Sequence, residues 1–379
     1  MKIAFTGGGT GGHFYPLIAV AEKIKSELTR EKILDCELYF IADKEYDKGA
    51  LFENNMKFVP ITAGKMRIYF SVQNILDMFK TFFGTIGAII TLFRIFPDVV
   101  FSKGGYVSFP TLVAARILGI PVVIHESDTH PGRVNAWAGK FAKRIAVSYP
   151  EAAEFFQKEK TAWTGQPIRE EIMTVEREGA FDFLKLDPTI PTLLILGGSQ
   201  GAEIINNALL DVLPDLVQKY QIIHQVGTAN IATYTEETNM VLAESEHKER
   251  YVPLAFLNVV TLRAAAGAAS LVITRAGSTI FEVAQWGIPS IVIPITTSNG
   301  DHQRKNAFAY GRAGGCVVVE ESNLTPHVLL AEIDLVLEDK AKYARLATGA
   351  KSFAKSDAAL VIARELLTIA ASHNKKSSS

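Results

Sequence analysis

The chain opens with Met1-Lys-Ile-Ala-Phe-Thr-Gly-Gly-Gly-Thr-Gly-Gly-His13, an apolar run that leads directly into a glycine-rich turn. The same design returns at Thr192-Leu-Leu-Ile-Leu-Gly-Gly-Ser-Gln-Gly-Ala202. Glycine allows the backbone to approach a ligand closely, and the N–H groups at the start of the next helix form a site for an anion. The two stretches therefore predict two nucleotide-sized half-sites for a phosphorylated ligand.

The composition predicts a soluble protein of two domains, because 379 residues with 48% hydrophobic content can bury two cores. A net charge of −1 gives no sign of a nucleic-acid partner, although residues 57–144 hold eleven basic and four acidic side chains. Cys36 and Cys316 match no metal-binding spacing and fit a reducing compartment. The N-terminus lacks the pattern of a signal peptide, so we expect a cytosolic location.

Apolar β-rich runs alternate with helical segments in both halves, which predicts parallel, doubly wound α/β sheets. We place the domains at 1–165 and 166–350, with the final helix, about 356–371, packing back on the first domain. Residues 374–379 are expected to form a disordered tail. The expected strands are Lys2–Thr6, Glu37–Ala42, Val99–Ser102, Pro121–His125 and Arg144–Val147, then Thr192–Leu196, Gln221–Val226, Ser270–Thr274, Ser290–Pro294 and Cys316–Val319.

The first glycine loop matches the G-x-G-x-x-G pattern of dinucleotide-binding proteins through Gly7, Gly9 and Gly12. The acidic residue that should end the second strand is misplaced, because Asp35 precedes that strand and Asp43 follows it too late. The chain also has no Tyr-x-x-x-Lys pair. An oxidoreductase is therefore disfavoured, and a tight turn without a ligand remains an alternative.

A longer stretch predicts a strand end, a turn of small residues, a helix and a second strand. Its sequence is Thr274-Arg-Ala-Gly-Ser-Thr-Ile-Phe-Glu-Val-Ala-Gln-Trp-Gly-Ile-Pro-Ser-Ile-Val-Ile-Pro294. Its helix carries Glu282 near its start and stops at Gly287. A carboxylate in that place can accept hydrogen bonds from both hydroxyls of a ribose. Alternatively, Thr279 and Glu282 form a capping box that only ties off helix N–H groups.

Eight motifs, in order from residue 1 to about 370, resemble the MurG family. This family transfers N-acetylglucosamine to lipid I in peptidoglycan synthesis and so forms lipid II. The motifs are Thr6–His13 with Pro16, Lys103–Tyr106, His125–Glu126, Gly132–Asn135, Gly165–Arg169, Gly197–Ala202, Arg275–Glu282 and Asp301–Asn306.

The resemblance implies a GT-B fold, with two Rossmann-like domains facing across a cleft. It also implies inverting transfer from UDP-N-acetylglucosamine to the C4 hydroxyl of the muramyl residue of lipid I, without a cofactor or a metal. A GT-B enzyme that acts on diacylglycerol is the alternative within the class. A dinucleotide-dependent oxidoreductase or epimerase and a non-catalytic UDP-sugar-binding protein are the alternatives outside it.

The resemblance assigns Glu282 to the ribose and Ser199, with the glycine-loop amides, to the diphosphate. It places Arg169 near the nucleotide and the main chain of Phe256 and Leu257 at the uracil. The other implied donor contacts are Thr10, Gly11, Gly12, Gln200, Gly201, His302, Gln303 and Asn306, and the implied acceptor contacts are Thr10, His13, Tyr106, His125, Glu126, Asp128 and Asn135. Many family members have Gln-Asn at positions 127 and 128, so Ser127-Asp128 puts the role of position 128 in doubt.

The reaction needs a base for the acceptor hydroxyl and stabilisation of the departing diphosphate. His13 is the preferred base because an ordinary histidine accepts a proton near pH 7. His13 could alternatively bind a phosphate or cap the turn, and His125 with Glu126 is the rival base. Helix N-terminal amides can stabilise the diphosphate without a metal. The chain has no Asp-x-Asp, and Glu126-x-Asp128 is its closest imitation.

A lipid acceptor predicts contact with a membrane, and the 65–96 region is the candidate. Thirteen uncharged residues lie between Lys80 and Arg94, fewer than the ~20 that a spanning helix needs. We therefore expect peripheral binding to the cytoplasmic face of the cell membrane through apolar side chains and flanking bases. A buried core helix is the alternative. Other cell-wall synthesis proteins are further candidate partners, and nucleic acid is not.

Overall fold

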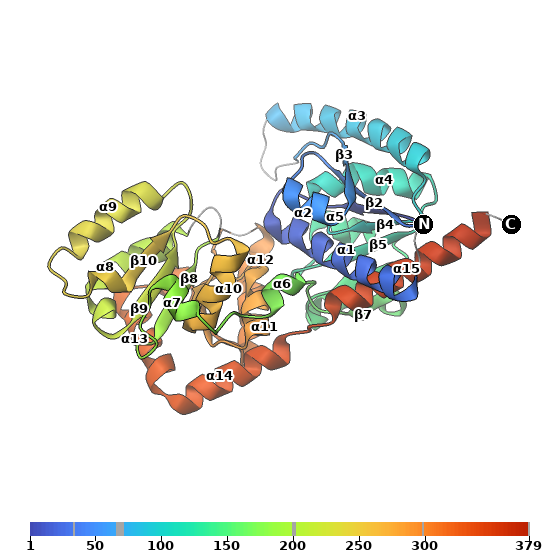
Figure 1. The fold of residues 1–379 in the computed structure, drawn as a ribbon. Coiled ribbons are helices and arrows are strands. Elements are labelled where there is room, and N and C mark those ends of the chain that lie inside the picture. Colours follow the sequence, from blue (N-terminus) through green and yellow to red (C-terminus); the bar gives the residue numbers. More distant parts are fainter. Residues whose placement is uncertain (33–34, 66–71, 199–201, 298, 378–379) are drawn as a thin grey trace. The chain divides into compact units, whose positions relative to one another are not determined.

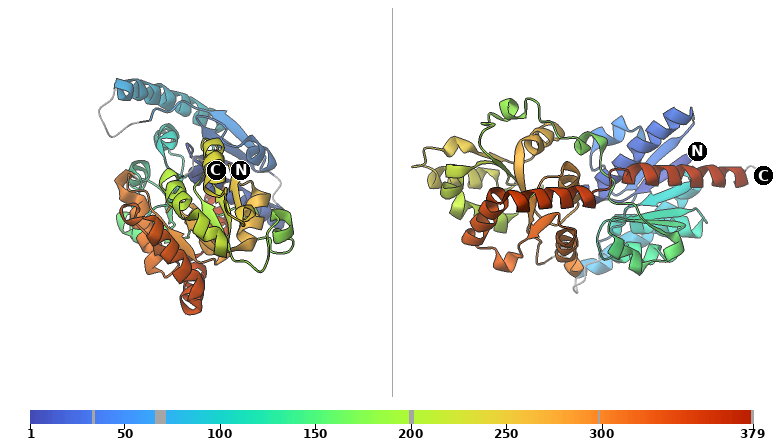
Figure 2. Two further views of the ribbon diagram at one scale, coloured as in Figure 1. Left: turned by 90° about the vertical axis from the view of Figure 1, so that its left-hand side faces the viewer. Right: turned by 90° about the horizontal axis from the view of Figure 1, so that it is seen from below.

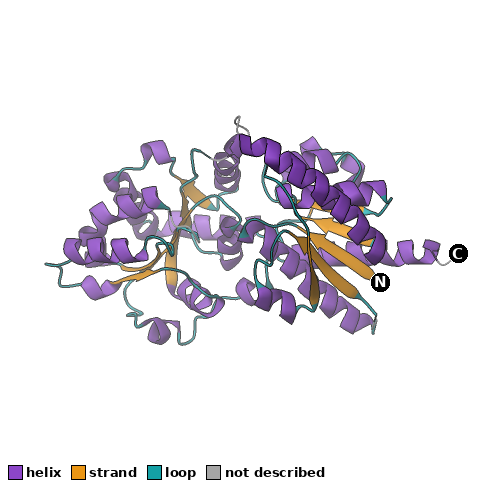
Figure 3. Ribbon diagram, turned by 90° about the horizontal axis from the view of Figure 1, so that it is seen from above, coloured by secondary structure: helices purple, strands orange, loops and turns teal. Residues whose placement is uncertain are grey.

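The computed structural model describes residues 1–32, 35–65, 72–198, 202–297 and 299–377. The chain divides into two compact units (Figure 1). The N-terminal unit consists of Met1–Arg169 and Lys355–Ser379, and the C-terminal unit consists of Glu170–Ala354. Each unit contains one parallel sheet flanked by helices (Figure 3).

The N-terminal unit is built on a seven-stranded parallel sheet with the order β3-β2-β1-β4-β5-β6-β7. Ile3, Phe5, Val99 and Phe101 of its central strands are buried because helices cover both sides of a doubly wound sheet. The strands are β1 (Lys2–Thr6), β2 (Glu37–Ala42), β3 (Met56–Pro60), β4 (Val99–Ser102), β5 (Val122–Glu126), β6 (Arg144–Val147) and β7 (Thr161–Trp163).

The helices of this unit include the last helix of the chain, α15, which packs beside α1 (Figures 1 and 2). The α-helices of the N-terminal unit are α1 (Gly11–Glu31), α2 (Lys48–Glu53), α3 (Val72–Ile95), α4 (Phe109–Ile117), α5 (Arg133–Ala138) and α15 (Ala358–Ser377). Its 3-10 helices are η1 (Tyr106–Ser108), η2 (Pro150–Phe155) and η3 (Lys158–Lys160).

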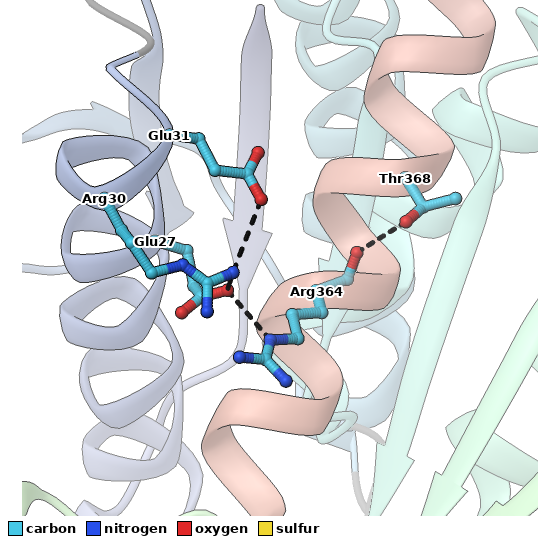
Figure 4. A network of polar contacts seen from close by, with 5 residues as sticks. All are labelled: Glu27, Arg30, Glu31, Arg364 and Thr368. Atoms are coloured by element: carbon cyan, nitrogen blue, oxygen red, sulfur yellow. Dashed lines mark hydrogen bonds and ion pairs between the residues drawn. The ribbon is translucent and has the colours of Figure 1, made fainter.

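An ion-pair network holds α1 and α15 together (Figure 4). The buried Glu27 Oε2 accepts hydrogen bonds from Arg30 at 2.6 Å and from Arg364 Nε at 2.8 Å. Arg364 comes from α15, so the last helix is tied to the first by charge as well as by packing.

The C-terminal unit has a six-stranded parallel sheet with the order β10-β9-β8-β11-β12-β13. Leu193, Ile195 and Ile273 from its two central strands are fully buried. The strands are β8 (Thr192–Leu196), β9 (Gln221–Gln225), β10 (Tyr251–Leu254), β11 (Ala269–Thr274), β12 (Ser290–Val292) and β13 (Cys316–Val318).

Local sequence signals start several helices of this unit. Thr325 and Asp339 accept hydrogen bonds from backbone N–H groups of the helices that follow them. The α-helices are α6 (Glu170–Met173), α7 (Ala180–Leu184), α8 (Glu203–Lys219), α9 (Ile231–Val241), α10 (Val259–Ala268), α11 (Thr279–Trp286), α12 (His302–Arg312), α13 (Pro326–Glu338) and α14 (Lys340–Phe353), and the 3-10 helices are η4 (Lys248–Arg250), η5 (Asn299–Asp301) and η6 (Glu321–Asn323).

The prediction of two parallel α/β sheets is confirmed, but three strands, β3, β7 and β10, were not foreseen. All three lie at the edges of their sheets. Edge strands are only half covered and tolerate proline, so they lack the long apolar run that marks a central strand. Pro60 in β3 and Pro253 in β10 show this tolerance.

Helix α15 continues to Ser377 and thus includes residues 374–377 of the expected disordered tail. No glycine or proline interrupts the sequence between Ala371 and Ser377, so nothing in the sequence stops the helix earlier.

Helix α3 extends over 24 residues, well beyond the thirteen uncharged residues on which the length argument was based. Its segment Gln73–Ile95 is long and apolar enough to cross a membrane by length and composition, with 22% of the most apolar window buried. The expectation that this segment is too short to span a bilayer is therefore wrong. Polar residues such as Gln73 and Asp77 are part of the helix and lengthen it.

Helix α3 packs against α4 and leaves most of its large apolar side chains exposed. Gly84, Ala88 and Leu92 are buried. A Cβ atom on Gly84 would overlap the carbonyl oxygen of Thr62, whereas a Cβ on Gly87 would meet nothing within 4 Å. The close approach at Gly84 thus attaches the helix to the 61–65 segment.

We expect Gly84→Ala to lower the free energy of unfolding by about 1–3 kcal/mol, because the added methyl group must displace the helix or Thr62. Gly87→Ala is the matched control on the same helix, and it should be neutral or stabilise the protein by up to about 1 kcal/mol. Urea unfolding measures both changes. Equal effects of the two substitutions would contradict the proposed close packing at Gly84.

Candidate functional site

The glycine-rich loops follow the strands at which each sheet reverses its order. This switch point lies between β1 and β4 in the N-terminal unit and between β8 and β11 in the C-terminal unit. Ligands of open α/β sheets bind beyond the carboxyl ends of strands at such points. The loops concerned are 7–10, 103–105 and 275–278, and a fourth stretch follows β8 and includes residues 199–201, which lie outside the described residues.

The first loop brings His13 toward the Lys103–Tyr106 loop. Gly9 has a φ of 90°, a conformation that favours glycine, and α1 begins at Gly11. His13 Nδ1 lies 3.0 Å from Thr10 Oγ1. A Cβ on Gly105 would stand 3.8 Å from His13 Nε2, so the imidazole of His13 lies beside the second turn.

Tyr106 and Asn135 belong to the same cluster. The Tyr106 ring would lie 3.7 Å from a Cβ on Gly9, and its hydroxyl donates to Asp43 Oδ2 at 3.4 Å. Burial, with the Asp43 carboxylate, raises the pKa of Tyr106. A Cβ on Gly104 would come within 2.8 Å of the Asn135 amide. The structure thus brings together three residues that the sequence placed on the acceptor side.

Glu126 orders the turn that follows β5. Its buried carboxylate accepts hydrogen bonds of 3.0 Å from the backbone N–H groups of Asp128 and Gly132 and from Asn135 Nδ2. Burial, followed by the neighbouring Asp128 carboxylate, raises the pKa of Glu126. Glu126 therefore shapes the loop, with its oxygens already bonded to the protein.

His125 is completely buried, and its Nε2 lies 3.0 Å from the carbonyl oxygen of Gly165. Because a carbonyl only accepts, Nε2 carries the proton and Nδ1 is the basic nitrogen. Nδ1 is buried without a hydrogen-bond partner among the described residues. Burial and the nearby Lys103 ammonium hold the pKa of His125 well below its usual value. These features do not support His125 as a base for an external substrate.

Lys103 is a site residue that sequence reasoning quoted but gave no role. Its side chain is buried, donates to Ser127 Oγ and lies near the Glu126 and Asp128 carboxylates. Burial lowers the pKa of Lys103 to about 8. The signal in the sequence was a lysine between a buried strand and two glycines. Asp128, at the position whose role was in doubt, adds negative charge beside this lysine.

Ser127 also belongs to a buried polar chain. Its hydroxyl donates to Gln166 Oε1 at 3.1 Å, and the Ser148 hydroxyl donates to the same oxygen at 2.9 Å. Gln166, which sequence reasoning also missed, thereby connects β5 and β6 to the stretch after β7.

On the C-terminal unit, Glu282 lies half-buried on α11, which follows the loop after β11. The N-cap residue is Ser278, not Thr279, and its side chain makes no capping hydrogen bond. The helix therefore begins one residue before the position at which a Thr279–Glu282 capping box would start it. By contrast, the neighbouring α10 is capped by Asn258, which accepts from Thr261 N at 2.9 Å.

His302 and Gln303 form the first turn of α12 and are half-buried. Gln303 Oε1 accepts a hydrogen bond from Ile295 N at 3.2 Å. Asn306 is buried, and its Nδ2 donates to the carbonyl oxygen of Ala276 at 3.2 Å. Asn306 thus ties α12 to the loop after β11.

The remaining expected donor residues are more dispersed. Phe256 is exposed and Leu257 is buried just before α10. The guanidinium of Arg169 lies 4.0 Å from the ring centre of Tyr15, within the N-terminal unit. Thr10 is exposed, and Gly11 and Gly12 form the start of α1. Ser199, Gln200 and Gly201 lie outside the described residues.

No group of three or more His, Cys, Asp or Glu side chains that could hold a metal ion occurs in the part of the chain that the structure describes. The residues that gather at the switch points are instead glycines, hydroxyls, amides and single acids or bases.

Two parallel α/β units with glycine loops at their switch points define the GT-B class of glycosyltransferases. The glycosyltransferase family 28 N-terminal domain matches residues 3–147, and the glycosyltransferase family 28 C-terminal domain matches residues 192–362. Similar curated proteins include a "UDP-N-acetylglucosamine--N-acetylmuramyl-(pentapeptide) pyrophosphoryl-undecaprenol N-acetylglucosamine transferase" of Clostridium novyi, 35% identical over 90% of this chain and 92% of that protein.

A protein of the same name from Treponema denticola is 34% identical over 98% of this chain and 99% of its own length. The chain therefore belongs to glycosyltransferase family 28 and, within it, to the MurG family that its motifs resemble.

Solved structures show the same fold. MurG of Acinetobacter baumannii aligns with a TM-score of 0.71 and 24% identity, over 97% of this chain and 99% of that chain. A putative UDP-N-acetylglucosamine 2-epimerase of Listeria monocytogenes aligns with a TM-score of 0.70 and 15% identity, over 95% of this chain and 94% of that chain. Fold similarity at these identities leaves function to be argued from the site.

Proposed function

We propose that this chain transfers N-acetylglucosamine from UDP-N-acetylglucosamine to the C4 hydroxyl of N-acetylmuramyl-(pentapeptide) pyrophosphoryl-undecaprenol. The observation that carries the proposal is the name shared by relatives that match this chain over nearly their full length. The two glycine loops at the switch points support it, since a sugar nucleotide and a lipid diphosphate both present anions. These relatives favour the muramyl acceptor over a diacylglycerol acceptor.

The donor half of the proposed site is the C-terminal unit. Glu282 accepts hydrogen bonds from the ribose hydroxyls, and the main chain at Phe256 and Leu257 contacts the uracil. We assign the diphosphate to Ser199 and the glycine-loop amides, which lie outside the described residues, and the sugar to His302 and Gln303. As the bond from the sugar to UDP breaks, negative charge builds on the diphosphate, and N–H groups at a helix start stabilise it.

The acceptor half is the cluster of His13, Tyr106 and Asn135. The acceptor O4 attacks C1 of the sugar from the face opposite UDP, so the configuration inverts. His13 takes the proton of the C4 hydroxyl as the new bond forms. His13 is the stronger candidate because its ring lies beside a glycine turn at the switch point, whereas His125 is enclosed by protein.

Membrane contact is proposed for the face of α3. Phe82, Phe83 and Phe93 are 60%, 65% and 69% exposed, which is unusual for such large apolar side chains on a folded surface. Lys80 and Arg94 flank them, and Lys140, Lys143 and Arg144 add positive charge elsewhere in the same unit. Because the opposite face of α3 is attached to α4 and to the 61–65 segment, we propose peripheral docking on an anionic cytoplasmic leaflet.

The parent protein should transfer radiolabelled N-acetylglucosamine to a short-chain lipid I analogue and not to diacylglycerol. His13→Gln should lower kcat by roughly 10²- to 10⁴-fold, because glutamine cannot accept the proton. The KM for the donor should change little. Activity of His13→Gln equal to that of the parent would remove His13 as the base, and transfer only to diacylglycerol would overturn the proposed acceptor.

Glu282→Gln should weaken UDP binding by roughly 10- to 150-fold, the loss expected when charge-assisted hydrogen bonds are removed. The melting temperature should stay near that of the parent, because the amide oxygen of glutamine can still accept a hydrogen bond from a helix N–H group. Calorimetric titration with UDP and thermal melting test the two quantities separately. A variant that binds UDP normally would require a different ribose contact.

Replacing Phe82, Phe83 and Phe93 by serine should reduce binding to vesicles that contain anionic lipid, while transfer to a water-soluble acceptor is retained. Phe52→Ser is the matched control, since Phe52 is 83% exposed on α2 rather than α3. Vesicle sedimentation and thermal melting should be measured together. Unchanged vesicle binding with a large drop in melting temperature would show that these side chains stabilise the fold instead.

A further inference from the structure

The buried carboxylate of Glu321 holds two loops of the C-terminal unit at once. Glu321 Oε1 pairs with Arg275 at 2.6 Å, and the two side chains are 6% and 13% exposed. Glu321 Oε2 accepts hydrogen bonds from Thr296 N at 2.9 Å and from the Thr296 hydroxyl at 2.7 Å. Arg275 begins the loop after β11, and Thr296 lies in the segment after β12.

The segment 293–297 is fixed at three successive points by side chains from outside it. Arg275 donates to the Ile293 carbonyl at 3.1 Å, Gln303 accepts from Ile295 N at 3.2 Å, and Glu321 binds Thr296. This segment leads into α12, whose first turn carries His302 and Gln303. Gln303 on that turn accepts from Ile295 N, so the segment and the start of α12 are in direct contact.

The Arg275–Glu321 ion pair makes the position of the 293–297 segment sensitive to the loss of either charge. Burial opposes ionisation of Glu321, but the Thr296 hydrogen bonds and the pairing with Arg275 hold the pKa of Glu321 below its usual value. The carboxylate is thus ionised at neutral pH. Neutralising it leaves the Arg275 guanidinium buried with a weaker partner, and the Thr296 contacts lose their charge-assisted character.

Helix α11 is anchored independently of this pair. Phe281 stacks on Phe353 of α14 with ring centres 5.4 Å apart, and Trp286 Nε1 donates to the carbonyl oxygen of Ile172 at 2.8 Å. Glu282, which lies next to Phe281, should therefore keep its place when the 293–297 segment loosens.

We propose that Glu321 is a positioning residue for the sugar of the donor. It acts through Arg275 and Thr296 and sets the 293–297 segment so that α12 meets the sugar in one arrangement. This inference rests on the proposed assignment of His302 and Gln303 to the sugar. It adds that the sugar contacts are preorganised by a buried ion pair, whereas Glu282 lies on a helix with further anchors of its own at Phe281 and Trp286.

The test compares Glu321→Gln with Glu332→Gln. Glu332 pairs with Lys342 at 3.2 Å between α13 and α14, with side chains 29% and 17% exposed, so its variant removes a charge from a similar pair away from the segment. For Glu321→Gln we expect a rise of about 10-fold in the KM for UDP-N-acetylglucosamine. The kcat should change much less, and the Kd of UDP should remain within about twofold of the parent value. Glu332→Gln should leave all three constants unchanged.

Thr296→Val and Thr296→Ser keep the test informative if Glu321→Gln unfolds. The valine variant loses the hydroxyl that donates to Glu321 and should raise the KM for UDP-N-acetylglucosamine. The serine variant keeps a hydroxyl and should have the KM of the parent. An unchanged KM in both Glu321→Gln and Thr296→Val would overturn the proposal, as would an equal loss of UDP and UDP-N-acetylglucosamine affinity. Failure of Glu282→Gln to weaken UDP binding would instead count against the proposed donor site itself.

Discussion

The parallel pairing of β1 with β4 and of β8 with β11 is the constraint on which the candidate site depends. The two strands of each pair are neighbours in space but distant in sequence. Each pairing therefore brings the segments that follow two strands to the same end of a sheet, where the strands have their carboxyl ends. The first pairing places His13 beside the Gly104–Gly105 turn. The second places the carboxyl end of β8 beside the carboxyl end of β11, from which the chain leads to Glu282. The same topological rule therefore applies in each of the two units.

Buried charges then shape these loops. Glu126 collects three hydrogen-bond donors and fixes the turn after β5, and Lys103 lies nearby within the same interior. In the other unit Glu321 fixes the segment after β12 through Arg275 and Thr296. Burying a charge costs free energy unless partners surround it, so a buried carboxylate strongly selects the one loop conformation that supplies its donors. In each unit, a buried carboxylate thus fixes a segment that follows a strand of the parallel sheet.

The apolar surface of α3 does not depend on buried charges. Gly84, Ala88 and Leu92 are buried, whereas Phe82, Phe83 and Phe93 are exposed, so this surface helix turns large apolar side chains outward. Close packing at Gly84 makes this possible because the helix can approach the 61–65 segment without a side chain between them. The outward apolar surface of α3 agrees with the lipid acceptor that we propose.

The sequence by itself determined the central strands, the parallel α/β class and the family, because buried strands and glycine loops are local patterns that survive without knowledge of contacts. It missed the edge strands β3, β7 and β10 and the full length of α3, since partial burial weakens a pattern. Only the tertiary structure decided that His125 is enclosed, that Lys103 is buried and that Glu321 joins two loops. The burial of a side chain and its pairing with another depend on residues that are far apart in the chain. The spacing of residues within one segment therefore does not predict these contacts.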